Sequence, residues 1–341
     1  MDSGLFMQER GMGLIELVPM PLKSRQEEQT RKKKVLVIAG PTAVGKTAIS
    51  LHIAEMLGGE IISADSMQVY RGMDIGTAKV SQEERARVHH HLIDIRDINQ
   101  PFNVANFCVE AQTAMKEIVL KEAVPIVVGG TGFYMHAIIY GPPSGPPSVP
   151  GVRQKLEREL AELGPMALYE RLKKLDPDYA IRITSADRHQ IIRGLEIISI
   201  TGLKVTEFTP SSPEQVSNYD FRCWFLYRPL SELYARIEKR CDEMLEHGLL
   251  DEVRQLEKRG LRENTSAAQA IGYRQCLEFL ASAQTPQEWQ DCVQKFKKAS
   301  RHYARRQFTW FRKEPLFRWI NIHDKGENAT AELIAQDFEL N

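Results

Sequence analysis

The sequence contains few cysteines, and their spacing supports neither a disulfide framework nor a zinc finger. The five cysteines are an odd number, no C-x-x-C motif occurs, and the two nearest in sequence, Cys276 and Cys292, are 16 residues apart. Disulfide-rich secreted domains and structural zinc sites use closely spaced, paired cysteines. We therefore expect a protein of the reducing cytoplasm that has neither feature.

Long apolar runs are also lacking. No run approaches the roughly 18 residues that a transmembrane helix needs. The N-terminal segment mixes charges with short apolar patches and shows no small-residue cleavage site, so we expect neither a membrane anchor nor a secretory signal. With 43% hydrophobic and 26% charged residues, the composition excludes disorder of the whole chain, and 341 residues suit two domains.

Neither sign of charge is in excess, but one segment is strongly basic. The chain has 45 lysines and arginines and 45 acids, which argues against a histone-like nucleic-acid binder. Between residues 295 and 313, however, eight cations occur without an acid. They are Lys295, Lys297, Lys298, Arg301, Arg305, Arg306, Arg312 and Lys313. This segment predicts a local site for a polyanion.

Short apolar runs alternate with helical periods in the first 140 residues. Apolar runs of this kind predict buried strands, and apolar residues at intervals of three and four predict helices. The strands are expected at 35–40, 60–66, 91–95 and 124–130, and the helices at 46–56 and 104–120. Strands that alternate with helices indicate a parallel α/β sheet.

Two breaks rich in proline or serine, at 141–151 and 209–217, divide the chain. The sequence between them is helical in character, and 221–229 looks like a strand that returns to the sheet. We therefore expect four parts. They are a poorly ordered N-terminal tail (1–33), an α/β core with a helical C-terminal part (34–142 and 215–320), a helical insertion domain (143–214) and a C-terminal tail (321–341).

A phosphate-binding loop follows the first strand. The residues Gly40, Pro41, Thr42, Ala43, Val44, Gly45, Lys46 and Thr47 match G-x-x-x-x-G-K-[ST] between an apolar strand and a helical period. Backbone N–H groups and the helix N-terminus would hold phosphate oxygens, Lys46 would reach the terminal oxygens, and Thr47 would bind Mg²⁺ through its hydroxyl. The fold predicted is therefore a P-loop NTPase-like parallel sheet core flanked by helices, with an inserted all-helical domain.

Two aspartates compete as the acid opposite this loop. Asp65 ends the strand at 60–66 and would lie at the carboxyl edge of the sheet, where it could act as a general base. Asp94 follows the next apolar run and could be the acid associated with Mg²⁺ in a nucleotide hydrolase. The run His89–His91 precedes Asp94, but neighbouring strand residues point to opposite faces, so structural or surface roles are favoured over a metal cluster.

Five sequence motifs together resemble one family. They are GPTAVGKT, ISADSMQVYRGMDIGTAK, VGGTGFY, AIGYRQ and RRQFTWFR, in this order. From about Val35 to Arg312 the sequence closely resembles the bacterial tRNA dimethylallyltransferases, also called tRNA isopentenyltransferases. The family transfers a dimethylallyl group from dimethylallyl diphosphate to N6 of adenosine 37, next to the anticodon on its 3′ side, and releases diphosphate.

The resemblance implies a role for each part of the site. The loop 40–47 would hold a departing diphosphate, with Lys46 and Mg²⁺ on Thr47 stabilising its charge. Asp65 matches the family's catalytic aspartate, which accepts the proton of the adenine N6. Thr131 aligns with a residue that helps to place the adenine. Lys46, Asp65 and Thr131 are thus the expected catalytic residues.

The resemblance also implies contacts with the anticodon stem-loop, whose target base must be extruded. The residues expected to bind tRNA are Asp65, Ser66, Met67, Gln68, Thr131, Arg153, His189, Gln190, Ile191, Ile192, Arg193, Gly272, Tyr273, Arg274, Arg305, Arg306, Gln307, Phe308, Thr309, Trp310, Phe311 and Arg312. Two positions depart from the family pattern. Gln190 replaces an arginine, which removes a cation from the insertion, and Val44 replaces a serine that we expect to point away from the phosphates.

We expect a monomer that prenylates tRNA. Three other functions compete with this one. A P-loop small-molecule kinase would use Asp65 as base and ATP in the loop, but has no need of the basic segment. A nucleotide-gated RNA-binding module has no need of Asp65. An adenylate isopentenyltransferase would share the phosphate loop but would not need a tRNA clamp.

Overall fold

The structure is a computed structural model, and the residues described from it are 32–143, 145–208 and 218–340. Nearly all of the expected N-terminal tail and the whole break at 209–217 lie outside the described residues. Residues from Lys33 onward form one compact unit.

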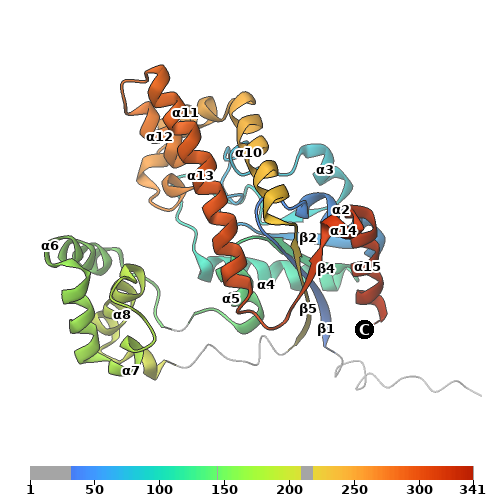
Figure 1. The fold of residues 1–341 in the computed structure, drawn as a ribbon. Helices are drawn as coiled ribbons and strands as arrows, with labels where there is room; N and C mark the ends of the chain where they lie inside the picture. Colours follow the sequence, from blue (N-terminus) through green and yellow to red (C-terminus); the bar gives the residue numbers. More distant parts are fainter. Residues whose placement is uncertain (1–31, 144, 209–217, 341) are drawn as a thin grey trace, which may run out of the picture. The chain divides into compact units, whose positions relative to one another are not determined.

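The core contains a six-stranded parallel sheet (Figure 1). Its order is β3-β2-β4-β1-β5-β6, and every neighbouring pair is parallel. The strands are β1 (Lys33–Ala39), β2 (Gly59–Ala64), β3 (His90–His91), β4 (Val124–Gly129), β5 (Tyr219–Tyr227) and β6 (Phe317–Asn321). The parallel α/β sheet is confirmed. The five residues Val35 to Ala39 are completely buried, because β1 is a central strand covered on both faces.

Helices connect and flank these strands. They are α2 (Lys46–Leu57), α3 (Gln82–Arg87), α4 (Val104–Leu120), α5 (Gly132–Tyr140), α10 (Leu230–Glu246), α11 (Leu249–Lys258), α12 (Tyr273–Leu280), α13 (Pro286–Phe311), α14 (Ile322–Lys325) and α15 (Glu327–Leu340). The ends of the long helices follow local chemistry: Asn103 caps α4, and Thr285 caps α13 through a reciprocal bond with Glu288. In the part of the chain that is described, no helix is long and apolar enough to cross a membrane.

The third strand is shorter than the sequence predicts. β3 contains only His90 and His91, and the expected strand at 91–95 is wrong for its last four residues. Leu92 and Asp94 have positive φ angles (63° and 56°), which no strand residue adopts. Asp94 is held there by Lys79 and Arg85, both 2.7 Å from its carboxylate oxygens.

The C-terminal end is part of the core, which corrects the expected tail at 321–341. α15 packs against α2, and Ala331 and Ile334 are completely buried. The sequence resemblance ends before this helix, so its packing could not be inferred from the family motifs.

The insertion forms helices with a core of their own. They are α6 (Pro150–Leu175), which is kinked at Gly164, α7 (Pro177–Ala180) and α8 (Arg188–Thr201). Leu156, Leu168, Leu172, Ile191, Ile192 and Leu195 make an apolar cluster that is separate from the main core. The helical character predicted for this segment is confirmed.

Candidate active site

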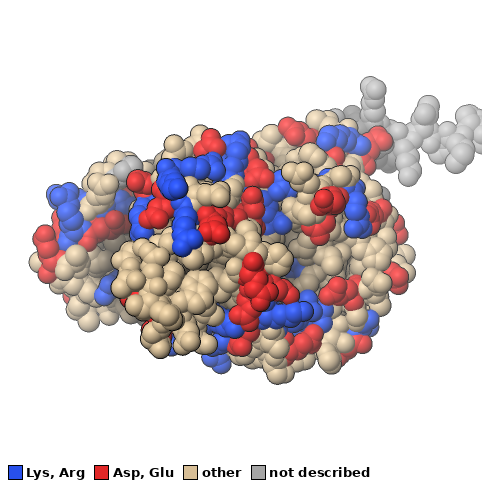
Figure 2. All heavy atoms as spheres, turned by 90° about the horizontal axis from the view of Figure 1, so that it is seen from above, with Lys and Arg blue, Asp and Glu red and all other residues tan. Residues whose placement is uncertain are grey.

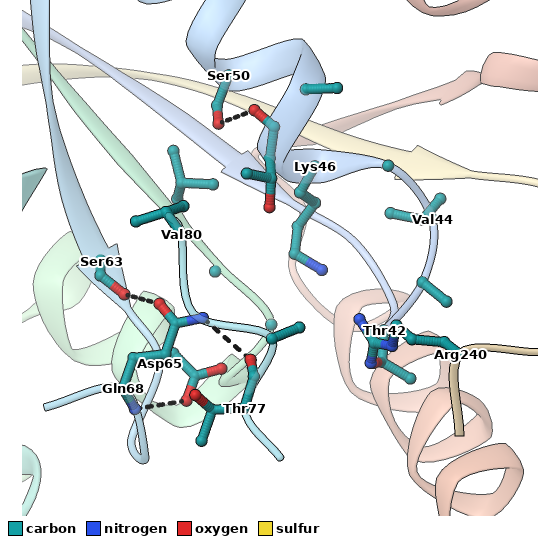
Figure 3. Close-up of a pocket in the computed structure, with 18 of the residues that line it drawn as sticks. Thr42, Val44, Lys46, Ser50, Ser63, Asp65, Gln68, Thr77, Val80 and Arg240 are labelled. Carbon is teal, nitrogen blue, oxygen red and sulfur yellow. Dashed lines mark hydrogen bonds between the residues drawn. The ribbon is translucent and has the colours of Figure 1, made fainter. Parts of the chain in front are cut away.

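A cavity of about 550 Å³ opens at the carboxyl ends of β1, β2 and β4. The phosphate-loop residues from Thr42 to Thr47 line one wall, and Asp65 and Gln68 line the opposite wall (Figure 3). α10 and α13 complete it with Arg236, Arg240 and Tyr303 among other residues. Ligands of open parallel sheets bind at this edge.

The phosphate loop has the backbone that its sequence predicts. Gly45 precedes α2 with φ 111°, a conformation that is strained for any other residue, and a Cβ atom there would also lie 2.9 Å from Oε1 of Glu327. Val44, the position that departs from the family pattern, is completely buried and packs in the main core. The N-terminus of α2 therefore faces the cavity and offers its backbone N–H groups to an anion.

Side chains from distant parts of the chain hold this loop from behind. Arg228 Nε donates to the carbonyl of Val44 at 2.9 Å, and Arg236 Nε donates to the carbonyl of Ala43 at 2.9 Å. Arg228 is itself paired with Glu232 at 2.7 Å and with Glu327 of α15 at 2.8 Å. The loop is thus fixed by β5, α10 and the C-terminal helix together.

Lys46 lies folded toward its own loop. Its Nζ donates to the carbonyls of Gly40 (2.9 Å) and Pro41 (2.8 Å). Burial, and then the positive charge of Arg240, lower the pKa of Lys46 to about 7, against an opposing effect of Asp65. Because the cavity concentrates positive charge beside Lys46, a bound anion would favour the protonated lysine.

Asp65 uses one carboxylate oxygen to build a turn. Its Oδ1 accepts from the backbone N–H groups of Met67 (2.8 Å) and Gln68 (3.3 Å). Among the described residues, no hydrogen bond to its Oδ2 is present. The side chain thus caps the turn and also has an oxygen to offer a substrate.

A second cavity, of about 290 Å³, meets the first at Asp65. Thr42, Asp65, Thr77, Arg240 and Tyr303 line both. Its remaining apolar lining comes from Met67, Ile237, Cys241, Met244, Ala270, Ile271, Tyr273 and Phe296, and its remaining polar lining from Ser66, Ser266, Gln269, Ser300 and Arg306. The phosphate-loop cavity and a second, more apolar cavity therefore share one carboxylate.

Tyr303 lies at this junction. Burial, and then the negative charge of Asp65, raise the pKa of Tyr303 to about 12, so the phenol stays protonated. The side chain of Thr131, which precedes α5, lies beside the Tyr303 hydroxyl. Thr131 is not among the residues that line either cavity, but its side chain lies next to their junction.

Three cavity residues could not be recognised as site residues in the sequence. Arg236, Arg240 and Tyr303 are far from the phosphate loop in sequence and occur in helices with many other charges. Arg240 bonds the Thr42 hydroxyl, and Figure 3 shows its guanidinium beside Thr42. Their helical spacing alone resembles that of any solvated helix face.

Asp94, the competing carboxylate, is not among the residues that line either cavity. Burial alone would raise the pKa of Asp94, but hydrogen bonds from Lys79 and Arg85 lower it overall. Its carboxylate is thus used in a structural ion-pair network, which favours Asp65 as the functional acid.

The expected tRNA residues of α13 divide between two faces. Arg305, Arg306, Thr309, Trp310 and Arg312 are exposed, whereas Phe308 is half-buried. Gln307 and Phe311 are buried, with exposed fractions of 5% and 0%, because they continue the core-facing row of Phe296, Ser300 and Ala304. Their expected contact with tRNA is not available in this structure.

The other expected tRNA residues also differ in exposure. Ser66, Met67 and Arg306 line the second cavity. Gln68 forms hydrogen bonds with Ser63 and Thr77 beside the first cavity. Arg274 is half-exposed. Gly272 and Tyr273 are buried, and Tyr273 Oη donates to Glu252 at 2.6 Å. Tyr273 therefore supports the turn at 74–76, whose N–H groups Glu252 also accepts, and offers nothing to solvent.

In the insertion, His189 and Gln190 are exposed, whereas Ile191 and Ile192 form its core and cannot touch a nucleic acid. Arg193 bonds Glu196 (2.9 Å) and the carbonyl of Pro146 (2.6 Å), and Arg153 is paired with Glu157 at 3.0 Å. None of these six residues lines either cavity.

Gln307 instead ties two loops of the site together. Its Oε1 accepts from the backbone N–H of Thr42 at 3.0 Å, and its Nε2 donates to the carbonyl of Gly130 at 2.9 Å. The buried carboxamide thus joins the phosphate loop to the loop after β4, which contains Thr131.

We expect Gln307→Ala to weaken binding of inorganic diphosphate by about tenfold, because the phosphate loop is no longer held in its binding conformation. The buried N–H and the buried carbonyl that it leaves unpaired should also lower the stability of the protein by roughly 1–3 kcal/mol each. Calorimetric titration measures the diphosphate affinity, and tRNA affinity should change little. Thr309→Ala, on the exposed face of the same helix, is the matched control. A loss of tRNA affinity with intact diphosphate binding would show that Gln307 contacts the nucleic acid instead.

Comparisons with known proteins agree with this geometry. The family model "IPP transferase" matches residues 68–314. The tRNA dimethylallyltransferase of Protochlamydia amoebophila is 56% identical over 312 residues, covering 92% of this chain and 91% of its own, and that of Chlamydia pneumoniae is 47% identical, covering 91% of both.

Solved structures are similar as well. The tRNA isopentenylpyrophosphate transferase of Bacillus halodurans has a TM-score of 0.66 at 39% identity and covers 91% of this chain and 98% of its own. A eukaryotic dimethylallyltransferase acting on tRNA has a TM-score of 0.72 at 29% identity, with 91% and 80% covered.

Proposed function

The chain belongs to the IPP transferase family, and we propose that its two joined cavities bring dimethylallyl diphosphate and a tRNA adenine together at Asp65. The protein is a prenyltransferase that transfers a dimethylallyl group to tRNA. The proposed acceptor is N6 of adenosine 37, and the products are N6-dimethylallyladenosine and diphosphate. The observation that carries this proposal is the single carboxylate shared by a phosphate-binding cavity and a more apolar one.

The diphosphate of the donor would occupy the first cavity. The N–H groups before α2 would hold its oxygens, and Lys46, Arg236 and Arg240 would neutralise its charge. These groups stabilise diphosphate most strongly when it has left the allylic carbon, which lowers the barrier to bond cleavage.

The site also fits Mg²⁺. Thr47 exposes its side chain at the first turn of α2 and lines the cavity, and a hydroxyl together with phosphate oxygens and water is a donor set that this ion accepts. Bound there, Mg²⁺ would supply further positive charge to the leaving diphosphate.

The adenine would lie at the junction of the cavities. Its N6 is a weak nucleophile, because the lone pair is delocalised into the ring, so Asp65 Oδ2 would accept a proton as the new C–N bond forms. The neutral phenol of Tyr303 and the hydroxyl of Thr131 offer hydrogen bonds beside it. The more apolar second cavity would keep water away from the cationic allyl group.

Incubation of the protein with dimethylallyl diphosphate, Mg²⁺ and unmodified tRNA, followed by nucleoside mass analysis, tests this proposal. A gain of one dimethylallyl group on adenosine is expected. Prenylation of free adenylate in place of tRNA would favour the adenylate isopentenyltransferase. ATP-dependent phosphorylation of a small molecule without prenyl transfer would favour the kinase.

The tRNA would be held by exposed cations of α13 and by Arg312, the residue that follows it. Lys298, Arg305 and Arg312 are seven residues apart, so they share one face of the helix, and all three are exposed. Two other cations of the basic segment already have acidic partners: Lys297 is 2.7 Å from Asp242, and Arg301 is paired with Glu238. On the face shown in Figure 2, basic and acidic residues are interspersed. On that face, tRNA binding would depend on a few unpaired cations rather than on a broad positive surface.

We expect the double variant Arg305→Ala/Arg312→Ala to flatten the salt dependence of tRNA binding. Each phosphate neutralised contributes roughly −0.7 to −0.9 to the log–log slope, so two lost contacts should change it by about one to two units. Affinity measured at salt concentrations from about 50 to about 300 mM gives this slope. Arg301→Ala is the control, because its guanidinium is already paired, and an equal change in this control would contradict the assignment.

A further inference from the structure

The edge of the sheet contains a cluster of metal-ligating side chains that the prenyl transfer does not use. Glu60, His89 and His91 place one carboxylate oxygen and two imidazole nitrogens within 4.8 Å of one another. Glu60 is the second residue of β2, so the cluster lies toward the amino ends of the strands, whereas the active site lies at their carboxyl ends. We propose that these three residues form a binding site for Zn²⁺ or a similar divalent transition metal.

The backbone of the three ligands is fixed before a metal arrives. β3 pairs with β2 in the register Ile61 to His90, and the carbonyl of His89 accepts the N–H of Ile61 at 2.9 Å. Residues two apart on an extended strand point to the same side, and the rings of His89 and His91 lie edge to face with centroids 4.5 Å apart. His90 points away and bonds the carbonyl of Val88 at 2.7 Å. The sequence argument against a three-histidine site is thus correct for His90, but it could not include Glu60.

The donor set selects the class of metal. Two imidazoles and a carboxylate suit Zn²⁺, whereas Mg²⁺ and Ca²⁺ prefer oxygen ligands only. Zinc bonds of about 2.0–2.2 Å place the ligand atoms of a tetrahedral site roughly 3.3 Å apart. The present separations are at most 4.8 Å, so rotations of the side chains would have to close only a small difference. With three protein ligands, the fourth position would hold water.

Lys121 competes for the same carboxylate. Its Nζ is 2.9 Å and 3.2 Å from the two oxygens of Glu60, while His91 Nε2 is 2.6 Å from Oε2. The Lys121 side chain is 54% exposed and can turn into solvent when a cation takes its place. Removing this lysine should therefore strengthen metal binding, which a merely structural role of the histidines would not predict.

The metal would stabilise the short edge strand β3. β3 has two residues, and the segment after it pairs with the turn that Asp65 caps, through Asp94 N to Gln68 O (3.2 Å) and Arg96 N to Val69 O (2.9 Å). A ligand that binds only the folded protein raises its stability. The proposed metal thus has a structural role, separate from the chemistry.

Metal-stripped full-length protein should bind one equivalent of Zn²⁺ in competition with a chromophoric chelator. His89→Ala and His91→Ala should each weaken binding more than about 100-fold, since even outer-shell partners cost 10–100-fold. Lys121→Met should tighten it, and His247→Ala, an exposed histidine of another helix end, should leave it unchanged. Zn²⁺ should raise the Tm of the wild-type protein but not that of His89→Ala.

If a histidine variant folds poorly, Glu60→Gln provides a second test, because it keeps the size of the side chain. This variant should also weaken Zn²⁺ binding. Unchanged affinity in His89→Ala, weaker binding in Lys121→Met, or no binding by the wild-type protein would overturn the proposal. None of these readouts depends on prenyl transfer, so they are independent of the proposed function.

Discussion

Asp65→Asn should reduce turnover roughly 10²–10⁴-fold while leaving tRNA affinity nearly intact, because it removes a proton acceptor and little else. The amide oxygen of asparagine can still accept from the N–H groups of Met67 and Gln68, so the turn that Asp65 builds should persist. Single-turnover rates at saturating substrates, together with a tRNA binding curve, measure both quantities.

Asp94→Asn is the matched control for this substitution. Asp94 also follows a strand, but its carboxylate is paired with Lys79 and Arg85 outside the cavities, so this variant should lose stability and keep its turnover. Wild-type turnover in Asp65→Asn would mean that Asp65 serves only as a cap of its turn.

Lys46→Ala should lower kcat/KM for dimethylallyl diphosphate by about 10²–10³-fold, the usual effect of removing a group that stabilises developing negative charge. Binding of tRNA in a gel-shift assay should remain nearly unchanged. If the purified protein hydrolyses ATP and this substitution abolishes that activity, the result would support a hydrolase or kinase over a prenyltransferase.

Proton uptake provides a second readout of the same lysine. The pKa of Lys46 is lowered to about 7 in the empty cavity, and a bound diphosphate raises it. At pH 8 the empty protein has mostly neutral Lys46, so binding should take up about one proton, whereas near pH 6 the lysine is already charged and uptake should vanish. Calorimetry in buffers of different ionisation enthalpy measures the uptake, and Lys46→Ala corrects for protons taken up by diphosphate itself.

Much of the fold could be predicted because its signals are local. The apolar runs that became β1, β2 and β4, and the glycines and lysine of the phosphate loop, are contiguous in sequence. β3 could not be predicted correctly, since an apolar run does not reveal that Leu92 and Asp94 take positive φ angles.

The site was only partly predictable for a different reason. Arg236 and Arg240 meet the loop about 190 residues away in sequence, and nothing distinguishes them beforehand from other charges on α10. For α13 a signal existed: Gln307 and Phe311 continue a core-facing row at helical spacing, so a polar residue within that row indicates a buried hydrogen-bonding role.

The support of the phosphate loop by Arg228 and Glu327 has a consequence for synthesis of the chain on the ribosome. The loop at 40–47 is made early, but the β5 strand beside it and the α15 helix behind it follow roughly 180 and 280 residues later. Since a strand buried on both faces is not stable without its neighbours, β1 of the nascent polypeptide cannot settle into the sheet until β5 has been made, and the loop gains its support from Glu327 only when α15 follows. Messages truncated shortly before α15 should therefore yield products that have every family motif and no working anion site.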